Sequence, residues 1–228
     1  MSLCTRVSLH RDVFVRERTK TCDYATSVTG VSPFLPPSPV TSPVDVKYCI
    51  DANDCISFVD DAWDAVAGRE NVPHLARTLV IGRPLWEYVA DETTRHLYRQ
   101  IVARVRAGRS AQFEIRCDGP EIRRVLELTI RPKPHLEHHV QFCTRTVRSV
   151  ERPRVSLLDY TLPRSTDVVR ACAWCSRIEV QGGDWLEVED AAHRLRLFEQ
   201  DELPRLSHGM CAPCSTDMYL KLEMLKSD

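Results

Sequence analysis

The sequence predicts an α+β protein: a five-stranded antiparallel sheet with helices on one face, followed by a small cysteine-bearing module. Between residues 45 and 150, two short β-prone runs precede helical patterns, and three further β-prone runs follow them. This order is typical of an antiparallel sheet whose helices gather on one face. Beyond residue 165, two CxxC pairs indicate a second, smaller unit.

The first two β-prone runs form a predicted hairpin. They read VKYCI and CISFV, and the turn-forming residues 51 to 54 lie between them. The next segment, DDAWDAVAGRE, places its apolar residues on one face at helical spacing. It therefore predicts a short helix.

The longest predicted helix is DETTRHLYRQIVARVRAG, which Gly108 closes. The segment GRPLWEYV before it predicts one or two further helical turns. The long helix has one apolar stripe, formed by Leu97, Ile101, Val102 and Val105.

The last three strands of the sheet are predicted from the runs AQFEIRCD, RRVLELTIRP and HVQFCTRTV. Alternation over residues 125 to 130 indicates one buried face and one wetter face. At about a hundred residues, this region is long enough to form its own core.

Composition is that of a soluble globular protein. The chain has 228 residues, of which 43% are hydrophobic and 28% charged, with a net charge of -1. Its bulk charge points to no polyanionic partner, and no apolar run approaches the roughly 20 residues that a membrane helix needs. The first twenty residues lack the continuous apolar segment of a secretory signal. We therefore expect a cytoplasmic protein whose ten cysteines are mostly reduced.

Four regions are expected along the chain. Residues 1 to 44 are rich in Pro, Ser and Thr and predict a disordered arm, with a Pro-rich partner-binding segment as the alternative. Residues 45 to 150 form the α+β domain, residues 151 to 165 a linker, and residues 166 to 228 the cysteine-bearing module.

The α+β region resembles the PAS sensory family. The phrases that carry the resemblance are DANDCISFVDDAW, IGRPLWEYV and FEIRCDGPEIRRVLELTIRP, within residues 46 to 148 and about half the chain. The resemblance implies a sensing and dimerization domain, as in bacterial signalling proteins, that passes a signal to an attached element. It also implies self-association through this domain.

The ligand of such a domain stays unknown from the sequence. The blue-light flavin-binding branch of the family has a reactive cysteine just before the long helix, whereas VIGRPLWEYVADETTRH has none. Some members hold haem through a helical histidine, and His96 lies on the long helix, although a surface role is the more usual one. Trp63 and Trp86 could stack a planar ligand, but we interpret them as core anchors.

A basic stretch lies on the predicted strands and the turn after them. Its side chains could meet a phosphate or form the charged outer face of the sheet, and we favour the outer face. The residues are Arg123, Arg124, Arg131 and Lys133.

The two CxxC pairs are the chemically most specific feature. Cys172 and Cys175 form one pair, Cys211 and Cys214 the other, and 35 residues lie between the pairs. A single pair would leave thioredoxin-like redox chemistry open, whereas four thiolates match a tetrahedral Zn²⁺ site. Such a closed site is structural rather than catalytic. His208 could replace one cysteine, but we interpret it as a hydrogen-bonding residue around the site.

The sequence around the pairs predicts the frame of the module. RIEVQGGDWLEVED predicts a hairpin, DAAHRLRLF a short helix, and STDMYLKLEML a helix that starts at the second pair. A knuckle facing a helix start resembles a treble-clef zinc site. The phrases CAWCSRIEVQGGDW and SHGMCAPC are also similar to a cysteine-rich tail found after PAS or receiver domains in bacterial signalling proteins.

The predicted function is a non-catalytic signal sensor or adaptor with a structural zinc module that contacts a protein partner. The sequence contains no GxxxxGK[ST], HExxH or GxSxG motif, so no enzyme is indicated. The alternative is a nucleic-acid-binding transcriptional regulator that uses the zinc module. A basic recognition helix would be expected for it, whereas STDMYLKLEMLKSD is nearly balanced in charge.

Overall fold

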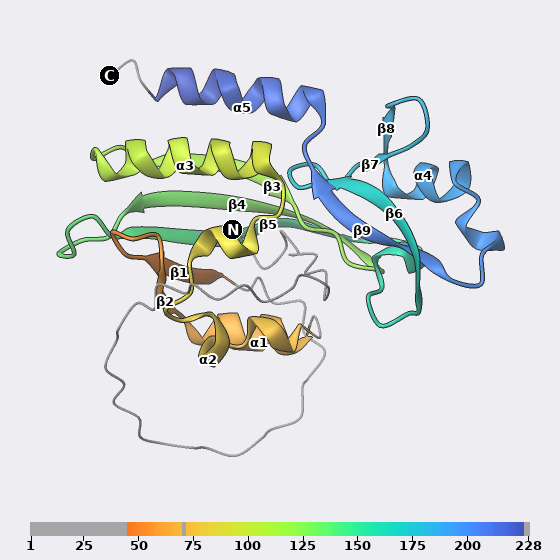
Figure 1. The fold of residues 1–228 in the computed structure, drawn as a ribbon, viewed down its shortest axis with the longest axis horizontal. Coiled ribbons are helices and arrows are strands. Elements are labelled where there is room, and N and C mark those ends of the chain that lie inside the picture. The colour runs from red at the N-terminus through yellow and green to blue at the C-terminus, as the bar shows by residue number, and fades with distance from the viewer. Residues whose placement is uncertain (1–44, 70–71, 226–228) are drawn as a thin grey trace.

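The structure is a computed structural model that describes residues 45–69 and 72–225. The arm expected over residues 1 to 44 lies outside the described residues. The described chain folds around a five-stranded antiparallel sheet and a separate four-stranded sheet (Figure 1). The predicted α+β class is therefore confirmed.

The five-stranded sheet has the strand order β2-β1-β5-β4-β3, and every pairing in it is antiparallel. The predicted hairpin at its start is confirmed, because the Asp51 carboxylate accepts hydrogen bonds from the backbone amides of Asn53 and Cys55 at 2.8 and 2.9 Å. The strands are β1 (Val46–Ile50), β2 (Ile56–Val59), β3 (Ala111–Arg116), β4 (Ile122–Pro132) and β5 (Val140–Glu151).

Three helices belong to this sheet: α1 (Asp61–Arg69), α2 (Arg77–Val80) and α3 (Glu92–Arg106). Short 3-10 turns at Pro73–Leu75 and Leu85–Tyr88 flank α2. The predicted long helix is α3, which begins where Asp91 accepts a hydrogen bond from the Thr94 amide at 2.7 Å. It ends before Gly108, whose φ of 95° lies in the left-handed region.

The helices pack on one face of the sheet, as predicted. The rings of Tyr48 on β1 and Phe142 on β5 stack with their centroids 4.6 Å apart, and Trp63 of α1 meets Tyr48 edge-on at 5.5 Å. Leu97 and Ile101 of α3 belong to the same buried cluster. Trp63 is a core anchor, since its Nε1 donates to the Leu75 carbonyl at 2.7 Å.

The four-stranded sheet has the order β8-β7-β6-β9, in which β6 and β9 are parallel. The hairpin and both helices expected after Cys175 are present, and Gly182 and Gly183 make the hairpin turn with φ of 94° and 84°. The elements are β6 (Arg164–Cys172), β7 (Ile178–Glu179), β8 (Trp185–Leu186), α4 (Val188–Arg194), β9 (Leu203–Gly209) and α5 (Ala212–Met224), with a 3-10 turn at Leu197–Glu199.

The segment expected to be a linker contributes to the core of this second sheet. A 3-10 turn at Ser156–Leu158 buries Leu157 and Leu158, which lie in one apolar cluster with Ile178 and Leu206. We call the part from β6 to α5 the cysteine module, and the part from β1 to β5 the five-stranded domain. No helix in the described ranges is long and apolar enough to cross a membrane.

Candidate metal centre

The four paired cysteines converge on one point of the cysteine module. The Sγ atoms of Cys172, Cys175, Cys211 and Cys214 all lie within 4.8 Å of one another, and the Sγ atoms of Cys175 and Cys211 are 3.7 Å apart. These residues come from two segments separated by 36 positions. The arrangement can hold a metal ion, and ligation by these four residues stays a prediction.

The first pair lies on a tight turn between β6 and β7. The Ser176 amide donates to the Cys172 carbonyl at 3.0 Å, and the Cys172 amide donates to the Arg177 carbonyl at 2.7 Å. Ser176 has a φ of 60°, in the left-handed region. This turn lets both thiols of the pair point to the same side.

The second pair lies at the start of α5. Cys211 is the N-cap residue, and its carbonyl accepts a hydrogen bond from the Ser215 amide at 3.0 Å. The Cys211 amide donates to the Cys172 Sγ at 3.5 Å. Because the N-terminal amides of a helix carry partial positive charge, they would help to balance the negative charge of cysteines bound to a metal here.

The cluster stabilises negative charge on its buried side. Hydrogen bonds from the thiols of Cys175 and Cys214 and from the backbone amide of Cys211 lower the pKa of Cys172 to about 2. The Cys172 thiolate in turn raises the pKa of Cys175. The sulfurs therefore favour a cation among them, since bound metal requires deprotonated thiols.

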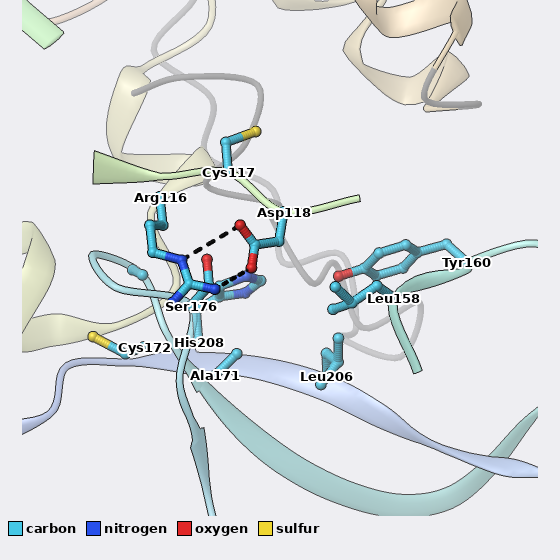
Figure 2. A pocket seen from close by; sticks show the side chains of 11 residues that line it. Arg116, Cys117, Asp118, Leu158, Tyr160, Ala171, Cys172, Ser176, Leu206 and His208 are labelled. Carbon is cyan, nitrogen blue, oxygen red and sulfur yellow. Dashed lines mark hydrogen bonds and ion pairs between the residues drawn. The ribbon is translucent and has the colours of Figure 1, made fainter. Parts of the chain in front are cut away.

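Among the described residues, the four side-chain atoms that could bind a metal at this point are all cysteine sulfurs. Cys172 and Cys211 are buried, whereas Cys175 and Cys214 are half-buried. His208 lies on β9 outside this group and lines a small cavity of about 30 Å³ with Arg116, Asp118 and other residues (Figure 2). That volume suits only one or two water molecules.

Trp174, between the cysteines of the first pair, inserts into the core of the five-stranded domain. Only 5% of its surface is exposed, and its ring centroid lies 5.4 Å from that of Tyr98 on α3 and 6.2 Å from that of Phe113 on β3. The Trp174 carbonyl accepts a hydrogen bond from the Arg116 amide at 2.8 Å. Sequence reasoning missed this role, although a large apolar residue at the tip of a knuckle signals a partner surface.

The helix that carries the second pair packs on the same domain. Met218 and Leu222 of α5 are buried in one cluster with Leu97 and Tyr98, and α5 lies along α3 in Figure 1. The ammonium of Lys221 lies 6.0 Å from the ring centroid of Phe113. Both halves of the four-cysteine cluster thus contact the five-stranded domain.

A network of ion pairs joins the two parts beside this contact. Arg116 pairs with Asp118 and, at 2.6 Å, with Glu187 at the start of α4. Arg152 pairs with Asp118 at 3.3 Å and with Glu189 at 3.1 Å. The Asp118 and Arg152 side chains are only 1% and 6% exposed. These pairs are screened little by salt because they are largely desolvated.

The basic stretch of the sheet is partly used in this network. Arg123 pairs with Glu189 at 3.0 Å, so the outer-face interpretation missed a contact between the two parts of the chain. Arg131 instead donates to the Gln141 side chain at 3.0 Å on the sheet itself. No sequence pattern linked Arg123 to a glutamate 66 positions away.

Acid is expected to weaken the contact between α4 and the sheet. Burial alone would raise the pKa of Glu187, but the hydrogen bond and charge of Arg116 outweigh it and lower the pKa below the ordinary value of 4.5. The pKa of Glu189 is also lowered, since a hydrogen bond from its own backbone amide and the charges of Arg152 and Arg123 together outweigh burial. Their stabilisation is complete above about pH 4.5 and is lost as the pH falls through the lower folded-state values.

Urea unfolding at pH 7, 5, 4 and 3 would measure this effect. The midpoint should change little between pH 7 and 5 and should fall as the pH drops below about 4.5, and the double variant Glu187→Gln with Glu189→Gln should show a smaller fall. An equal pH dependence in the wild type and the double variant would contradict the assignment to these two carboxylates.

Other sequence candidates lie apart from the cluster. His96 is exposed on α3 and hydrogen-bonds Gln100 at 2.7 Å. Trp86 is half-buried, and its Nε1 donates to Asp54 at 2.6 Å. Cys55 and Cys117 each take part in a disulfide, so the expectation of mostly reduced cysteines does not hold at these two positions.

Comparison with known proteins gives only distant structural likeness. No family model matches the chain, and no curated protein matches it. A domain of an HTR-like protein from Haloarcula marismortui is similar with a TM-score of 0.33 and 16% identity, covering 46% of this chain and 98% of that chain. A sensory box sensor histidine kinase from Vibrio cholerae is similar with a TM-score of 0.33 and 14% identity, covering 47% of this chain and 82% of that chain. By its own geometry, the chain is an α+β domain with a four-thiol cluster packed against it.

Proposed function

We propose that the chain is a non-catalytic signal sensor or adaptor. In this proposal residues 45 to 150 are a PAS-like sensing and dimerization domain, residues 151 to 165 a connector, and residues 166 to 228 a structural zinc module that contacts a protein partner. The observation that carries it is the packing of the four-cysteine cluster against the long helix α3 of the five-stranded domain. A conformational change in that domain would therefore be transmitted to the cysteine module.

The metal of this proposal is Zn²⁺ held by Cys172, Cys175, Cys211 and Cys214. Four thiolates suit Zn²⁺ because it accepts soft sulfur ligands in tetrahedral geometry without geometric demands of its own. Four protein ligands fill that geometry and leave no position for a substrate. The metal would therefore hold the fold rather than perform chemistry.

The surface of α5 supports contact with a partner protein. Tyr219, Leu220 and Met224 are exposed on this helix, although they are large and apolar. The only lysine of α5 pairs with Asp217 at 2.8 Å. Because α5 thus offers no basic stripe, the nucleic-acid-binding alternative gains no support.

X-ray absorption and native mass spectrometry of the full chain would test the proposal. We expect one zinc per chain with four sulfur neighbours at about 2.3 Å. A metal with an oxygen ligand or an open position would contradict the structural role and point to catalysis. A salt-dependent shift of DNA by the purified chain would favour the nucleic-acid alternative.

A further inference from the structure

We propose that the four-cysteine metal site is coupled to the core of the five-stranded domain through Trp174, so that metal binding orders helix α3. The inference rests on the proposed zinc site and adds its regulation. Two segments of the cysteine module bring cysteines to the site. Each segment also places apolar side chains in the buried core of the five-stranded domain. We call these side chains the anchors: Trp174 from the first segment, Met218 and Leu222 from the second.

The first anchor lies inside the loop that the metal would close. Trp174 has a cysteine ligand on either side of it within three positions, at Cys172 and Cys175. Fixing both thiols fixes the backbone between them, and with it the direction of the indole. The carbonyl of Trp174 is also held by the Arg116 amide at the end of β3.

The insertion of the Trp174 indole has one unfavourable feature. Its Nε1 is buried without a hydrogen-bond partner among the described residues. Burying an unpaired N–H costs free energy, which the ring contacts with Tyr98 and Phe113 must offset. A loop held by a metal would keep the indole inserted, whereas a loop free to rearrange could withdraw the N–H to water.

The anchors of the second segment also link the metal site to the core of the five-stranded domain. Met218 and Leu222 lie on the helix whose first turn bears Cys211 and Cys214. A metal ion bound by all four sulfurs would therefore join the two anchor segments into one unit. By linkage, metal that favours the docked anchors is itself bound more tightly when the anchors are docked.

Hydrogen exchange of the full chain, loaded with zinc or treated with chelator, would test the coupling. In the wild type, removing zinc should speed exchange of the α3 amides about tenfold, within the usual range for coupled sites. In Trp174→Ala, zinc should bind more weakly, and the zinc response of α3 should be clearly smaller than in the wild type, because only Met218 and Leu222 of α5 still link the site to this core. Trp174→Phe keeps a ring between Tyr98 and Phe113 and should behave like the wild type.

Phe198→Ala is the matched control, because Phe198 is an aromatic residue of the same module but is 69% exposed. It should leave the zinc response of α3 unchanged. The coupling is overturned if α3 of the wild type does not respond to zinc while the module does, or if Trp174→Ala responds like the wild type. A wild type that binds no zinc would overturn the coupling and the proposed zinc site together. If the metal has an open coordination position and α3 still responds to zinc, only the structural role of the site is overturned.

Discussion

Replacing Cys172 by serine is expected to abolish stoichiometric metal binding and to unfold the turn between β6 and β7 that carries Cys172 and Cys175. Cys172 is buried at the end of β6, and its sulfur accepts the Cys211 amide at 3.5 Å. A serine hydroxyl is a poor ligand for a soft site and does not become an anion at neutral pH. Because binding free energy of a structural zinc is folding free energy, losing the ligand loosens the module.

The size of this effect should exceed that of replacing neighbours of the site. Removing a hydrogen-bonding residue around a metal site typically weakens affinity about 10–100-fold, and loss of a ligand should cost more. Zinc affinity can be measured by competition with a chromophoric chelator, and protection of the module by limited proteolysis. The five-stranded domain should stay folded, because most of its buried cluster lies outside the module.

Two control variants separate ligand loss from general damage. Cys143→Ser changes a free cysteine on β5 outside the cluster and should retain one zinc. His208→Gln should weaken binding less than Cys172→Ser, since His208 lies outside the sulfur group. Undiminished zinc binding in Cys172→Ser would refute the four-sulfur site.

Asp118→Asn is expected to destabilise the protein by about 3–5 kcal/mol, the usual cost of breaking a buried ion pair on one side. The Asp118 carboxylate pairs with both Arg116 and Arg152 and is nearly fully buried. An amide of the same size keeps the volume but leaves two guanidinium groups without that countercharge. Glu187 and Glu189 already pair with Arg116 at 2.6 Å and with Arg152 at 3.1 Å, so neither carboxylate is free to take the place of Asp118.

The free energy of unfolding from urea titration would measure this cost. Glu121→Gln is the matched control, since it removes the exposed pair with Arg154, whose side chains are 66% and 51% exposed. Such a pair is worth at most about 1 kcal/mol. If Asp118→Asn cost no more than Glu121→Gln, the network would not be an important link between the domain and the module.

Local patterns predicted most of the secondary structure. Alternation over residues 125 to 130 and the helical stripe of residues 97 to 105 each depend on neighbours along the chain, and both occur where predicted. The predicted short helix is α1, in which Gly68 is the penultimate residue, because a glycine near a helix end is tolerated at a modest cost.

The spacing of the cysteines predicted which residues of the metal site meet, because a CxxC turn brings two thiols to one side whatever surrounds it. The sequence alone therefore determined the candidate ligands and the order of the elements that carry them. It did not reveal where the module lies. Residues 155 to 158 were expected in a linker, yet they pack with Ile178 and Leu206, since burial of their apolar side chains depends on strands that come later in the chain.

Only the tertiary structure decided that the module and the five-stranded domain share a core. Trp174 meets Tyr98 and Phe113 across more than sixty positions, and Arg152 meets Glu189 across 37. No periodicity encodes such contacts, because each depends on the relative placement of two complete sheets. The sequence shows that Trp174 and the charged residues are present. Which residues they contact is decided only when the module and the five-stranded domain have folded against each other.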